Sequence, residues 1–442
     1  MFYKILSQST PDAELSISKK SKIANAYKDG SIITLLAGSI GKKVTINITD
    51  KLEKDTIKVS TKVINDLSIR QGDVYQLIGT NKRIRIGPII GLLIFTKKSS
   101  ITSRALKRMF DYTLSYDSMK GILYVFSVDS IDFTTKTVNG FCYNSSKHIW
   151  EEGIFPFPDA IYRRVSMSKK TINLIQTATR NHMYNSLHFN KLDFWNMASS
   201  SKEISEHIPM TKVYKSIQDI NEMLKSYKIL FLKPINSTRA FGLMRITKNG
   251  MAYSIQEKMA EKPELFTSKE EASSYIDTFR KDRNYLVQEG IDLLNFDNRY
   301  IDFRVIMQKD HLLKWQCTGI ITSMGKKGGV CSNYDADDKY MVFEAFFNKY
   351  FTISKEEIFR KKQEIIMLCK KACKVLDEKS GNYADLGIDV GLDKNLKPWI
   401  FEMNNRRHMH EMSLLINDYD AYFRAKTNPV IYGAKLSGFD IL

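Results

Sequence analysis

Three oxygen-bearing side chains late in the chain have the types and spacing of a cation site. Glu402 and Asn404 stand two residues apart in a strand-like segment, and Asp389 stands in the strand-like segment before it. Residues two apart on a strand point to the same face, and a hairpin can bring Asp389 opposite them. Two carboxylates and one amide oxygen form a hard, all-oxygen cluster suited to Mg²⁺, which binds through a few carboxylates and substrate phosphates.

The apolar residues of the same segments predict how this hairpin is buried. We expect Ile388, Val390, Ile400 and Phe401 to cover the face opposite the carboxylates. A carboxylate pair in such a setting is costly without a compensating charge, so a metal ion is a natural partner. Three polar residues on a solvated hairpin are the alternative explanation of the same pattern.

A lysine upstream indicates phosphate as the partner of that cation. Lys233 closes a strand-like run, and a turn of small residues that reaches Gly242 follows it. An ammonium group beside backbone N–H groups suits phosphate contact. Taken alone the signal is weak, because most lysines at strand ends are merely solvated.

Hydrophobic alternation and capping signals predict the elements that position these residues. The dipeptide Asn249-Gly250 favours a hairpin turn, and Ser-x-x-Glu capping boxes begin at Ser268 and Ser354. We expect helices at 268–281 and 354–379, and strands at 229–233, 242–246, 251–256, 285–288, 303–308, 315–322, 386–391 and 399–403.

The first half of the chain predicts two further domains. Residues 1–82 form a small β-rich domain, because short alternating segments recur there. Residues 83–205 mix strands with a helix expected at 103–119, which indicates an α/β layer. Within this block, Asn139-Gly140 predicts a hairpin turn.

Taken in order, several short motifs resemble the YheC/YheD family of endospore-coat-associated ATP-grasp proteins. The most specific element is the 13-residue spacing from Asp389 to Glu402. The other motifs are FLKP at 231–234, QEGI at 288–291, DFR at 302–304, GID at 387–389 and EMN at 402–404. Further familial segments extend the resemblance over nearly the whole chain, at 87–93, 161–165, 207–211 and 428–436.

The resemblance implies an α+β protein with an ATP-grasp fold of two α+β lobes. An α/β pre-ATP-grasp domain and the small β-rich N-terminal domain would precede it. The ATP-grasp domain would cover residues 206–442, with the lid lobe at about 212–287 and the metal-binding lobe at about 288–442. Its cofactors would be ATP and Mg²⁺, and its partners an unknown carboxylate or amine acceptor and spore-coat proteins.

The resemblance also implies roles for individual residues. Lys233 would contact the α and β phosphates, Lys191 is the candidate for a second phosphate lysine, and Asp389, Glu402 and Asn404 would bind Mg²⁺. The loop over the phosphates and the hinge against adenine would comprise Ser237, Thr238, Gly242, Gln288, Glu289, Gly290 and Ile291, with backbone groups of Glu289 and Ile291 facing the base.

Arg304 has two open roles. By the resemblance it would act with Lys233 in catalysis, holding the γ-phosphate or an acyl phosphate. An ion pair with Asp302 or another carboxylate explains an arginine at this position equally well.

The chain departs from the family pattern on the loop and acceptor sides. Ser237 and Ala240 replace glycines of the phosphate loop, and a lost glycine restricts φ where backbone approaches phosphate. An arginine expected beyond Gly319, a Gly-Gly expected after Asn333 and a Pro-Gly expected after Asn404 are also replaced. The metal cluster is intact.

Composition limits the partners of the chain. The net charge of +18 favours anionic partners, but the 67 Lys and Arg residues are scattered along the chain. Nucleic acid is therefore supported by charge alone, and we do not expect it as a partner. The most apolar stretch, 87–95, is less than half of the roughly 20 residues that cross a bilayer, and no secretory signal is visible. We expect a cytoplasmic protein without a membrane span.

The cysteines and histidines predict no additional metal site. Five cysteines, an odd number, fit a reducing compartment. Cys369 and Cys373 stand four apart on a predicted helix and suit the core of the protein. His408 and His410, beside Glu411, are expected on the surface of a polar loop.

We consider three functions and favour the first. The first is an ATP-dependent ligase that phosphorylates a carboxylate for attack by an amine or another nucleophile. The second is a non-catalytic nucleotide-binding scaffold of a protein layer such as the spore coat. The third is a nucleic-acid binder.

Overall fold

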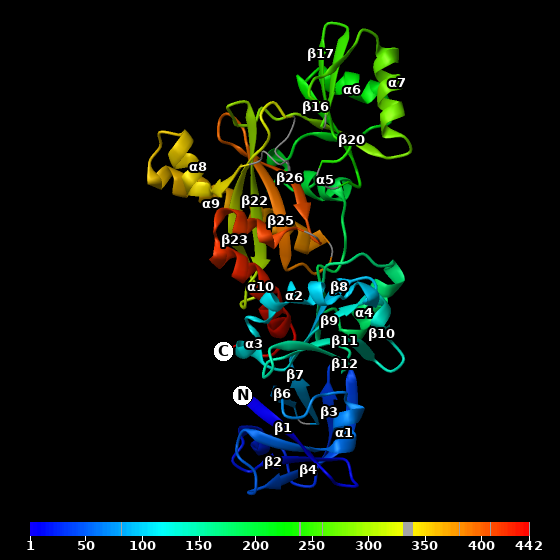
Figure 1. The fold of residues 1–442 in the computed structure, drawn as a ribbon, viewed down its shortest axis with the longest axis vertical. Helices are drawn as coiled ribbons and strands as arrows, with labels where there is room; N and C mark the ends of the chain where they lie inside the picture. Colours follow the sequence, from blue (N-terminus) through cyan, green and yellow to red (C-terminus); the bar gives the residue numbers. More distant parts are fainter. Residues whose placement is uncertain are drawn as a thin grey trace.

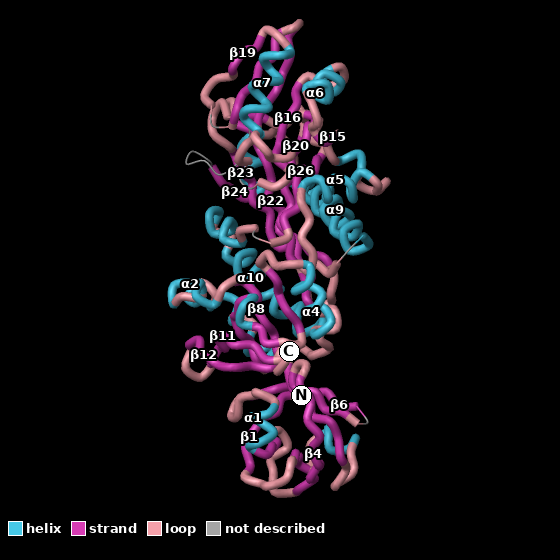
Figure 2. The backbone as a smooth tube through the Cα atoms, turned by 90° about the vertical axis from the view of Figure 1, so that its right-hand side faces the viewer, coloured by secondary structure: helices cyan, strands magenta, loops and turns pink. Residues whose placement is uncertain are grey.

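The described part of the chain folds into four β-sheets arranged along a long, narrow molecule. The structure is a computed structural model that describes residues 1–80, 82–237, 240–258, 260–329, 339–379, 381–406 and 408–441. The N-terminal strands lie at one end and the sheet of residues 211–289 lies at the other (Figure 1). Figure 2 shows the same succession from the side. In the described part of the chain, no helix has the length and apolar character that crossing a membrane requires.

The N-terminal segment closes into a β-barrel. Its last strand includes Ile84 and Ile86, which are fully buried in the barrel core, so the barrel extends past the limit expected at residue 82. In spatial order the strands are β1 (Phe2–Gln8), β5 (Thr56–Ser60), β2 (Glu14–Ser18), β4 (Ile40–Thr49), β3 (Ile32–Ala37), β7 (Arg83–Gly87) and β6 (Val74–Thr80), and the short helix α1 is Thr61–Asp66.

The second sheet is parallel at its centre, as an α/β layer requires. Its order is β10 (Ile131–Asp132), β11 (Thr137–Asn144), β9 (Ile122–Ser127), β8 (Ile89–Phe95), β13 (Ala160–Arg163) and β14 (Met183–Tyr184), with β12 (Ile149–Pro156) on β11 and helix α4 at Lys169–Ala178. Strands β9, β8, β13 and β14 pair in parallel with one another in that order, and β9 pairs antiparallel with β11 on its other side.

Two local predictions in this sheet are wrong. Asn139-Gly140 lies inside β11, and the chain turns after Asn144, whose side chain accepts hydrogen bonds from two turn N–H groups. A Cβ at Gly140 would come 2.8 Å from the carbonyl oxygen of Val125, so the glycine serves close strand packing. The single helix expected at 103–119 is instead α2 (Ser103–Lys107), a 3₁₀ turn at Phe110–Thr113 and α3 (Tyr116–Met119). Aromatic contacts of Phe110 and Tyr116 with Tyr143 accompany this break.

The third sheet is antiparallel throughout. It contains β15 (Thr211–Val213), β20 (Tyr285–Glu289), β16 (Ile229–Pro234), β17 (Met244–Asn249), β18 (Ala252–Glu257) and β19 (Glu264–Phe266), covered by α6 (Ile217–Leu224) and α7 (Lys269–Arg280). The hairpin at Asn249-Gly250 is confirmed, and so is the capping box of Ser268 with Glu271.

The fourth sheet carries the predicted cation cluster. Its order is β24 (Lys339–Val342), β23 (Trp315–Met324), β22 (Arg299–Lys309), β25 (Asp385–Leu392) and β26 (Pro398–Asn404), with β21 (Asn295–Phe296) on β22 and helices α8 (Phe343–Tyr350) and α9 (Lys355–Lys379). Cys369 and Cys373 are buried free thiols on α9, as predicted. Helix α5 (Lys191–Ser199) packs against α9 and β26, although the sequence placed it with the second domain.

The C-terminal segment returns to the first half of the molecule. Helix α10 (Tyr419–Leu436) packs against β22 and β23 of the fourth sheet and against β8 and β13 of the second. Beyond it, Phe439 is fully buried, and the backbone of Asp440 exchanges hydrogen bonds of 2.7 and 2.9 Å with the Gln76 side chain of the barrel. The last residues therefore tie barrel, second sheet and fourth sheet together.

Candidate functional site

The late hairpin forms with the register that the cation cluster needs. Asp389 of β25 lies directly opposite Glu402 of β26, and Asn404 lies opposite Gly387. Residues that face each other across an antiparallel pair share a face, so the three side chains lie on one side of the sheet. Ile388, on the other side, is fully buried.

A bulge changes the position of one expected core residue. Val390 pairs with Ile400 and Asp389 pairs with Glu402, so Phe401 is an extra residue in β26 without a partner on β25. Bulges re-aim side chains. Phe401 was expected on the face opposite the carboxylates, but it lines the pocket beside them, and that expectation is wrong.

The neighbouring strand β22 brings a cation to this face. Arg304 pairs in register with Asp389, and its Nε donates a hydrogen bond to Oδ1 of that carboxylate. The two side chains are only 11% and 18% exposed. Nδ2 of Asn404 lies 3.4 Å from the other oxygen of Asp389. Of the two roles open to Arg304, this structure displays the ion pair with a carboxylate.

Glu402 is a carboxylate that needs a positive partner. Burial raises its pKa, the Asp389 charge raises it further, and Lys191, Lys233 and Arg304 oppose that rise. Nζ of Lys191 lies 3.6 Å from Oε1 of Glu402, so the contact is an ion pair without a close hydrogen bond. A divalent cation between Glu402 and Asp389 would relieve the repulsion of the two charges, and the donor set therefore fits Mg²⁺.

Lys191 links the two lobes. It is the first residue of α5, and its Nζ donates a 2.8 Å hydrogen bond to the carbonyl oxygen of Ser237 in the loop that follows β16. The same ammonium group faces Glu402 on the fourth sheet. Lys191, the candidate for a second phosphate lysine, thus lies between the loop after β16 and the carboxylates of the fourth sheet.

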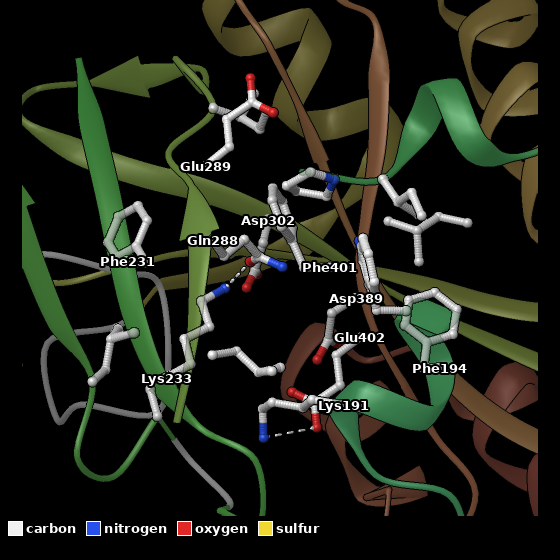
Figure 3. A pocket seen from close by; sticks show the side chains of 18 of the residues that line it. Lys191, Phe194, Phe231, Lys233, Gln288, Glu289, Asp302, Asp389, Phe401 and Glu402 are labelled. Carbon is white, nitrogen blue, oxygen red and sulfur yellow. Dashed lines mark hydrogen bonds and ion pairs between the residues drawn. The ribbon is translucent and has the colours of Figure 1, made fainter. Parts of the chain in front are cut away.

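Lys233 projects into the same space from the third sheet. Its Nζ donates to Oε1 of Gln288 at 2.5 Å and lies 5.6 and 5.5 Å from the ring centroids of Phe231 and Phe401. Nε2 of Gln288 donates to Thr211 at 3.0 Å, which fixes the orientation of the amide. Figure 3 shows Lys233 and Gln288 on one wall of the pocket, and Asp389, Glu402 and Lys191 on the other.

The segment predicted as the hinge, at the end of β20, is held by hydrogen bonds to Met210 and Ile229. The N–H of Glu289 donates to the carbonyl of Met210 at 2.8 Å, and the N–H of Met210 donates to the Glu289 side chain at 3.1 Å. The N–H of Gly290 donates to the carbonyl of Ile229, and a Cβ at Gly290 would come 2.7 Å from the Ile229 side chain. The N–H groups of Glu289 and Gly290 are therefore both engaged within the protein.

One pocket between the third and fourth sheets gathers most of the predicted site. The predicted residues that line it are Lys191, Lys233, Ser237, Gln288, Glu289, Ile291, Asp389 and Glu402. Gly242, Gly290, Arg304 and Asn404 adjoin it without lining it. Thr238 lies outside the described residues, as does the segment after Asn333.

Sequence reasoning missed the apolar part of this pocket. The apolar lining includes Phe194, Trp195, Ile208, Pro209, Phe231, Leu286, Leu293, Ile400 and Phe401. Phe231 could have been found, because it stands two residues before Lys233 on one strand and shares its face. Apolar walls with a few polar groups are typical of small-molecule sites.

The loop after β16 contains an alanine in a backbone conformation that favours glycine. Ala240 lines the pocket and has a φ of 51°, in the left-handed region that glycine adopts at lower cost. Gly242 also has a positive φ, 77°. The loop therefore keeps a glycine-type conformation with an alanine in it.

The two histidines expected on a polar surface loop are in fact buried. His408 is 3% exposed and His410 is fully buried. Both contact Asp385 at the start of β25 and lie outside the pocket described above.

Comparison with known proteins gives matches in sequence and in fold. A family model described as "YheC/D like ATP-grasp" matches residues 180–436. The endospore coat-associated protein YheD of Bacillus subtilis (strain 168) is 23% identical over 394 residues, which cover 84% of each chain. The endospore coat-associated protein YheC of the same organism is 22% identical over 303 residues, 65% of this chain and 81% of that one.

Solved structures of ligases are similar to the chain at low sequence identity. PsnB, solved with its minimal precursor, is 11% identical with a TM-score of 0.41, over 77% of this chain and 100% of that chain. The VanG D-Ala:D-Ser ligase of Enterococcus faecalis is 11% identical with a TM-score of 0.44, over 78% of this chain and 100% of that chain.

Proposed function

Because the chain belongs to the YheC/D-like ATP-grasp family, we propose that it binds MgATP in the pocket between its third and fourth sheets. The observation that carries this proposal is the convergence in one pocket of two facing carboxylates and two lysines, with a strand end that joins the lobes. A single solvated hairpin would not gather these groups.

The polar groups divide by the part of the nucleotide that each would contact. Lys191 and Lys233 would donate to phosphate oxygens, and the carbonyl of Glu289 with the N–H of Ile291 would face adenine. Asp389, Glu402 and Asn404 would hold Mg²⁺, which neutralises phosphate charge when it is bound. To approach the γ-phosphate, Arg304 would have to leave Asp389.

We propose that the reaction is an ATP-dependent carboxylate–amine ligation or a similar condensation. A carboxylate oxygen of the acceptor attacks the γ-phosphorus, the bond to the β–γ bridging oxygen breaks, and ADP leaves. An amine then attacks the acyl carbon, the bond between that carbon and the phosphate oxygen breaks, and inorganic phosphate leaves as the amine loses a proton. The side chains named above stabilise charge and position groups, which is most of what phosphoryl transfer needs from a protein.

The test is ADP release that depends on an added carboxylate and an added amine. Wild type should release ADP when both acceptors are present, and Glu402→Ala should not. A broad acceptor screen in which MgATP binds and no ADP appears would refute the ligase proposal and leave binding intact.

A second candidate is a catalytically impaired nucleotide-binding scaffold of a spore-coat-type assembly. The left-handed φ of Ala240 and the pairing of Arg304 with Asp389 favour it, because both disfavour the arrangement that turnover needs. YheD and YheC are named endospore coat-associated proteins. For this chain we therefore propose coat proteins as partners and a location in the cytoplasm at the forming coat. Recruitment of coat proteins that needs MgATP binding but no hydrolysis would support it, and robust ligation would exclude it.

A further inference from the structure

A second polar cluster lies in the core, apart from the nucleotide pocket. Asp385 begins β25, and His408 and His410 follow β26. All three are at most 3% exposed, and their potential ligand atoms lie within 4.8 Å of one another. Asp385 stands four residues before Asp389, which is roughly 13 Å along a strand. The cluster is therefore distinct from the carboxylates of the pocket.

Both imidazoles approach one buried carboxylate, and ring nitrogens of both histidines have no hydrogen-bond partner among the described residues. Nε2 of His408 lies 2.8 Å from Oδ2 of Asp385, and Nε2 of His410 lies 3.2 Å from both oxygens of the same carboxylate. Nδ1 of His408 and Nδ1 of His410 lack a hydrogen-bond partner in the described chain. Buried polar atoms without partners are costly and rare, so this set requires an explanation.

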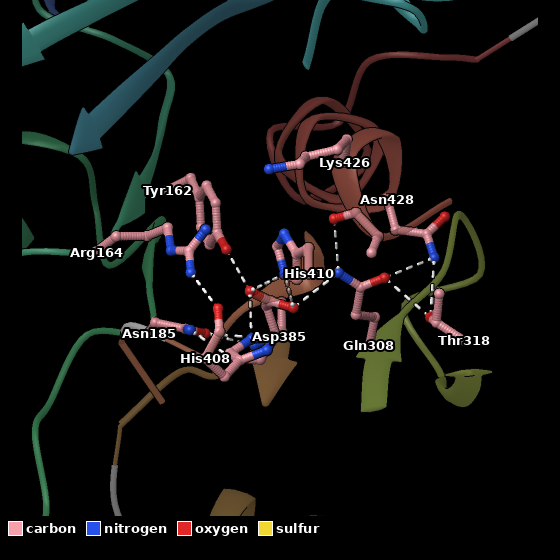
Figure 4. Close-up of polar contacts among 12 residues, drawn as sticks. Tyr162, Arg164, Asn185, Gln308, Thr318, Asp385, His408, His410, Lys426 and Asn428 are labelled. Carbon is pink, nitrogen blue, oxygen red and sulfur yellow. Dashed lines mark hydrogen bonds and ion pairs between the residues drawn. The ribbon is translucent and has the colours of Figure 1, made fainter. Parts of the chain in front are cut away.

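Asp385 is held as an oriented ligand would be. Tyr162 donates to its Oδ2, and Gln308 donates to its Oδ1 at 2.7 Å. Gln308 is fixed in turn by Thr318 at 2.9 Å and by Asn428 at 3.1 Å (Figure 4). Hydrogen-bonded supports behind a ligating carboxylate are typical of metal sites.

The backbone around the cluster is also fixed. Asn185 donates to the carbonyls of Asp385 and Asn405, both at 2.7 Å, and Arg164 donates to the carbonyl of His408 at 2.6 Å. Asn185 directly follows β14 of the second sheet, so these bonds connect the second sheet to the loop that carries the histidines. The positions of the three side chains are therefore determined by both parts of the molecule.

We propose that Asp385, His408 and His410 bind a divalent transition-metal ion, with Zn²⁺ as the first candidate, in a structural site. Two imidazoles and a carboxylate favour such an ion over Mg²⁺, which prefers oxygen ligands. Metal–ligand distances of about 2.0 to 2.2 Å place tetrahedral ligand atoms about 3.3 to 3.6 Å apart. The separations of 2.8 Å from His408 and 3.2 Å from His410 to the carboxylate are shorter than this, so the ligand atoms would move slightly apart around a bound ion.

The role is structural because the cluster is enclosed. No side chain of the three exceeds 3% exposure, so a substrate has no route to the ion. The ion would fasten the loop after Asn404 to β25 and, through Tyr162 and Asn185, to the second sheet. The strand that carries Glu402 would be fixed at its C-terminal end.

Metal analysis of the full chain tests this proposal without reference to ATP. The chain, purified from zinc-supplemented cells and desalted, should contain about one zinc per molecule, and excess Mg²⁺ should not displace it. Loss of a residue that only supports a metal ligand weakens metal binding by ~10- to 100-fold. His410→Gln removes a ligand itself, so it should weaken zinc binding by more than that. His311→Gln, in an exposed turn, and Asp389→Asn, in the other site, should retain the metal.

Titration of the wild type keeps the test decisive if His410→Gln does not fold. Protein stripped with a chelator should gain thermal stability as Zn²⁺ is added, with a Tm that rises with zinc concentration. Co²⁺ in place of Zn²⁺ should give visible absorption of a tetrahedral cobalt site. Zinc at background level, together with a Tm of stripped protein that Zn²⁺ does not change, would overturn the proposal in favour of a metal-free polar cluster.

Discussion

Replacing Lys191 with methionine separates a phosphate-binding lysine from a lysine that only links the lobes. Nζ of Lys191 lies 2.8 Å from the Ser237 carbonyl and 3.6 Å from Glu402, and the side chain is 17% exposed. Methionine keeps much of the length of the side chain and removes the charge and its three donors. The perturbation therefore acts on electrostatics more than on packing.

The expected magnitude follows from the type of bond that is lost. A hydrogen bond to a charged group contributes about 1.5 to 3 kcal/mol, which corresponds to a roughly 10- to 140-fold rise in the Kd for MgATP. The ion pair with Glu402 is partly exposed, so its loss should lower the free energy of unfolding by less than about 1 kcal/mol. Affinity should thus change far more than stability.

Isothermal titration calorimetry of MgATP measures the first quantity, and thermal melts measure the second. Lys202→Met is the matched control, because Lys202 is exposed and lies outside the pocket, and its Kd should equal that of the wild type. A Kd for Lys191→Met that equals the wild-type value would refute the assignment of this lysine to phosphate.

Three further predictions follow from single residues. Folding raises the pKa of Glu402 above its ordinary value of 4.5, so between the unfolded and the folded pKa the folded chain binds more protons than the unfolded chain. Metal-free wild type should therefore lose stability as the pH rises through that range, whereas Glu402→Gln should not. Thermal melts at a series of pH values compare the two proteins. Gly290→Ala places a Cβ 2.7 Å from the Ile229 side chain and should lower the free energy of unfolding by about 1–3 kcal/mol. Urea melts measure this, and an unchanged midpoint would contradict the close contact between Gly290 and Ile229. Ala240→Gly removes the strain of a φ of 51° and should lower the Kd for MgATP. A higher Kd would show that Ala240 does not hinder nucleotide binding.

Local signals were sufficient for the elements that carry the site. The capping box at Ser268, the turn at Asn249-Gly250 and the facing of Asp389 with Glu402 all depend on residues close in sequence, and the structure contains each of them. Periodicity and turn chemistry report such short-range geometry.

Features that depend on contacts between distant segments were not predictable. The bulge that turns Phe401 into the pocket has no composition signal, and Gly140 is determined by the approach of β9 rather than by a turn. His408 and His410 stand in a polar stretch, but Asp385 and the second sheet enclose them. Lys191 reaches the pocket only because α5 packs on the fourth sheet.

The central claim, that the facing carboxylates bind the cation of MgATP, is tested most directly by calorimetric titration of nucleotide into wild type and Asp389→Asn. We expect one MgATP per wild-type chain, weaker binding when Mg²⁺ is omitted, and loss of that magnesium dependence in a folded Asp389→Asn variant. Wild-type binding that is equally strong without Mg²⁺, or no binding of MgATP at all, would contradict the account.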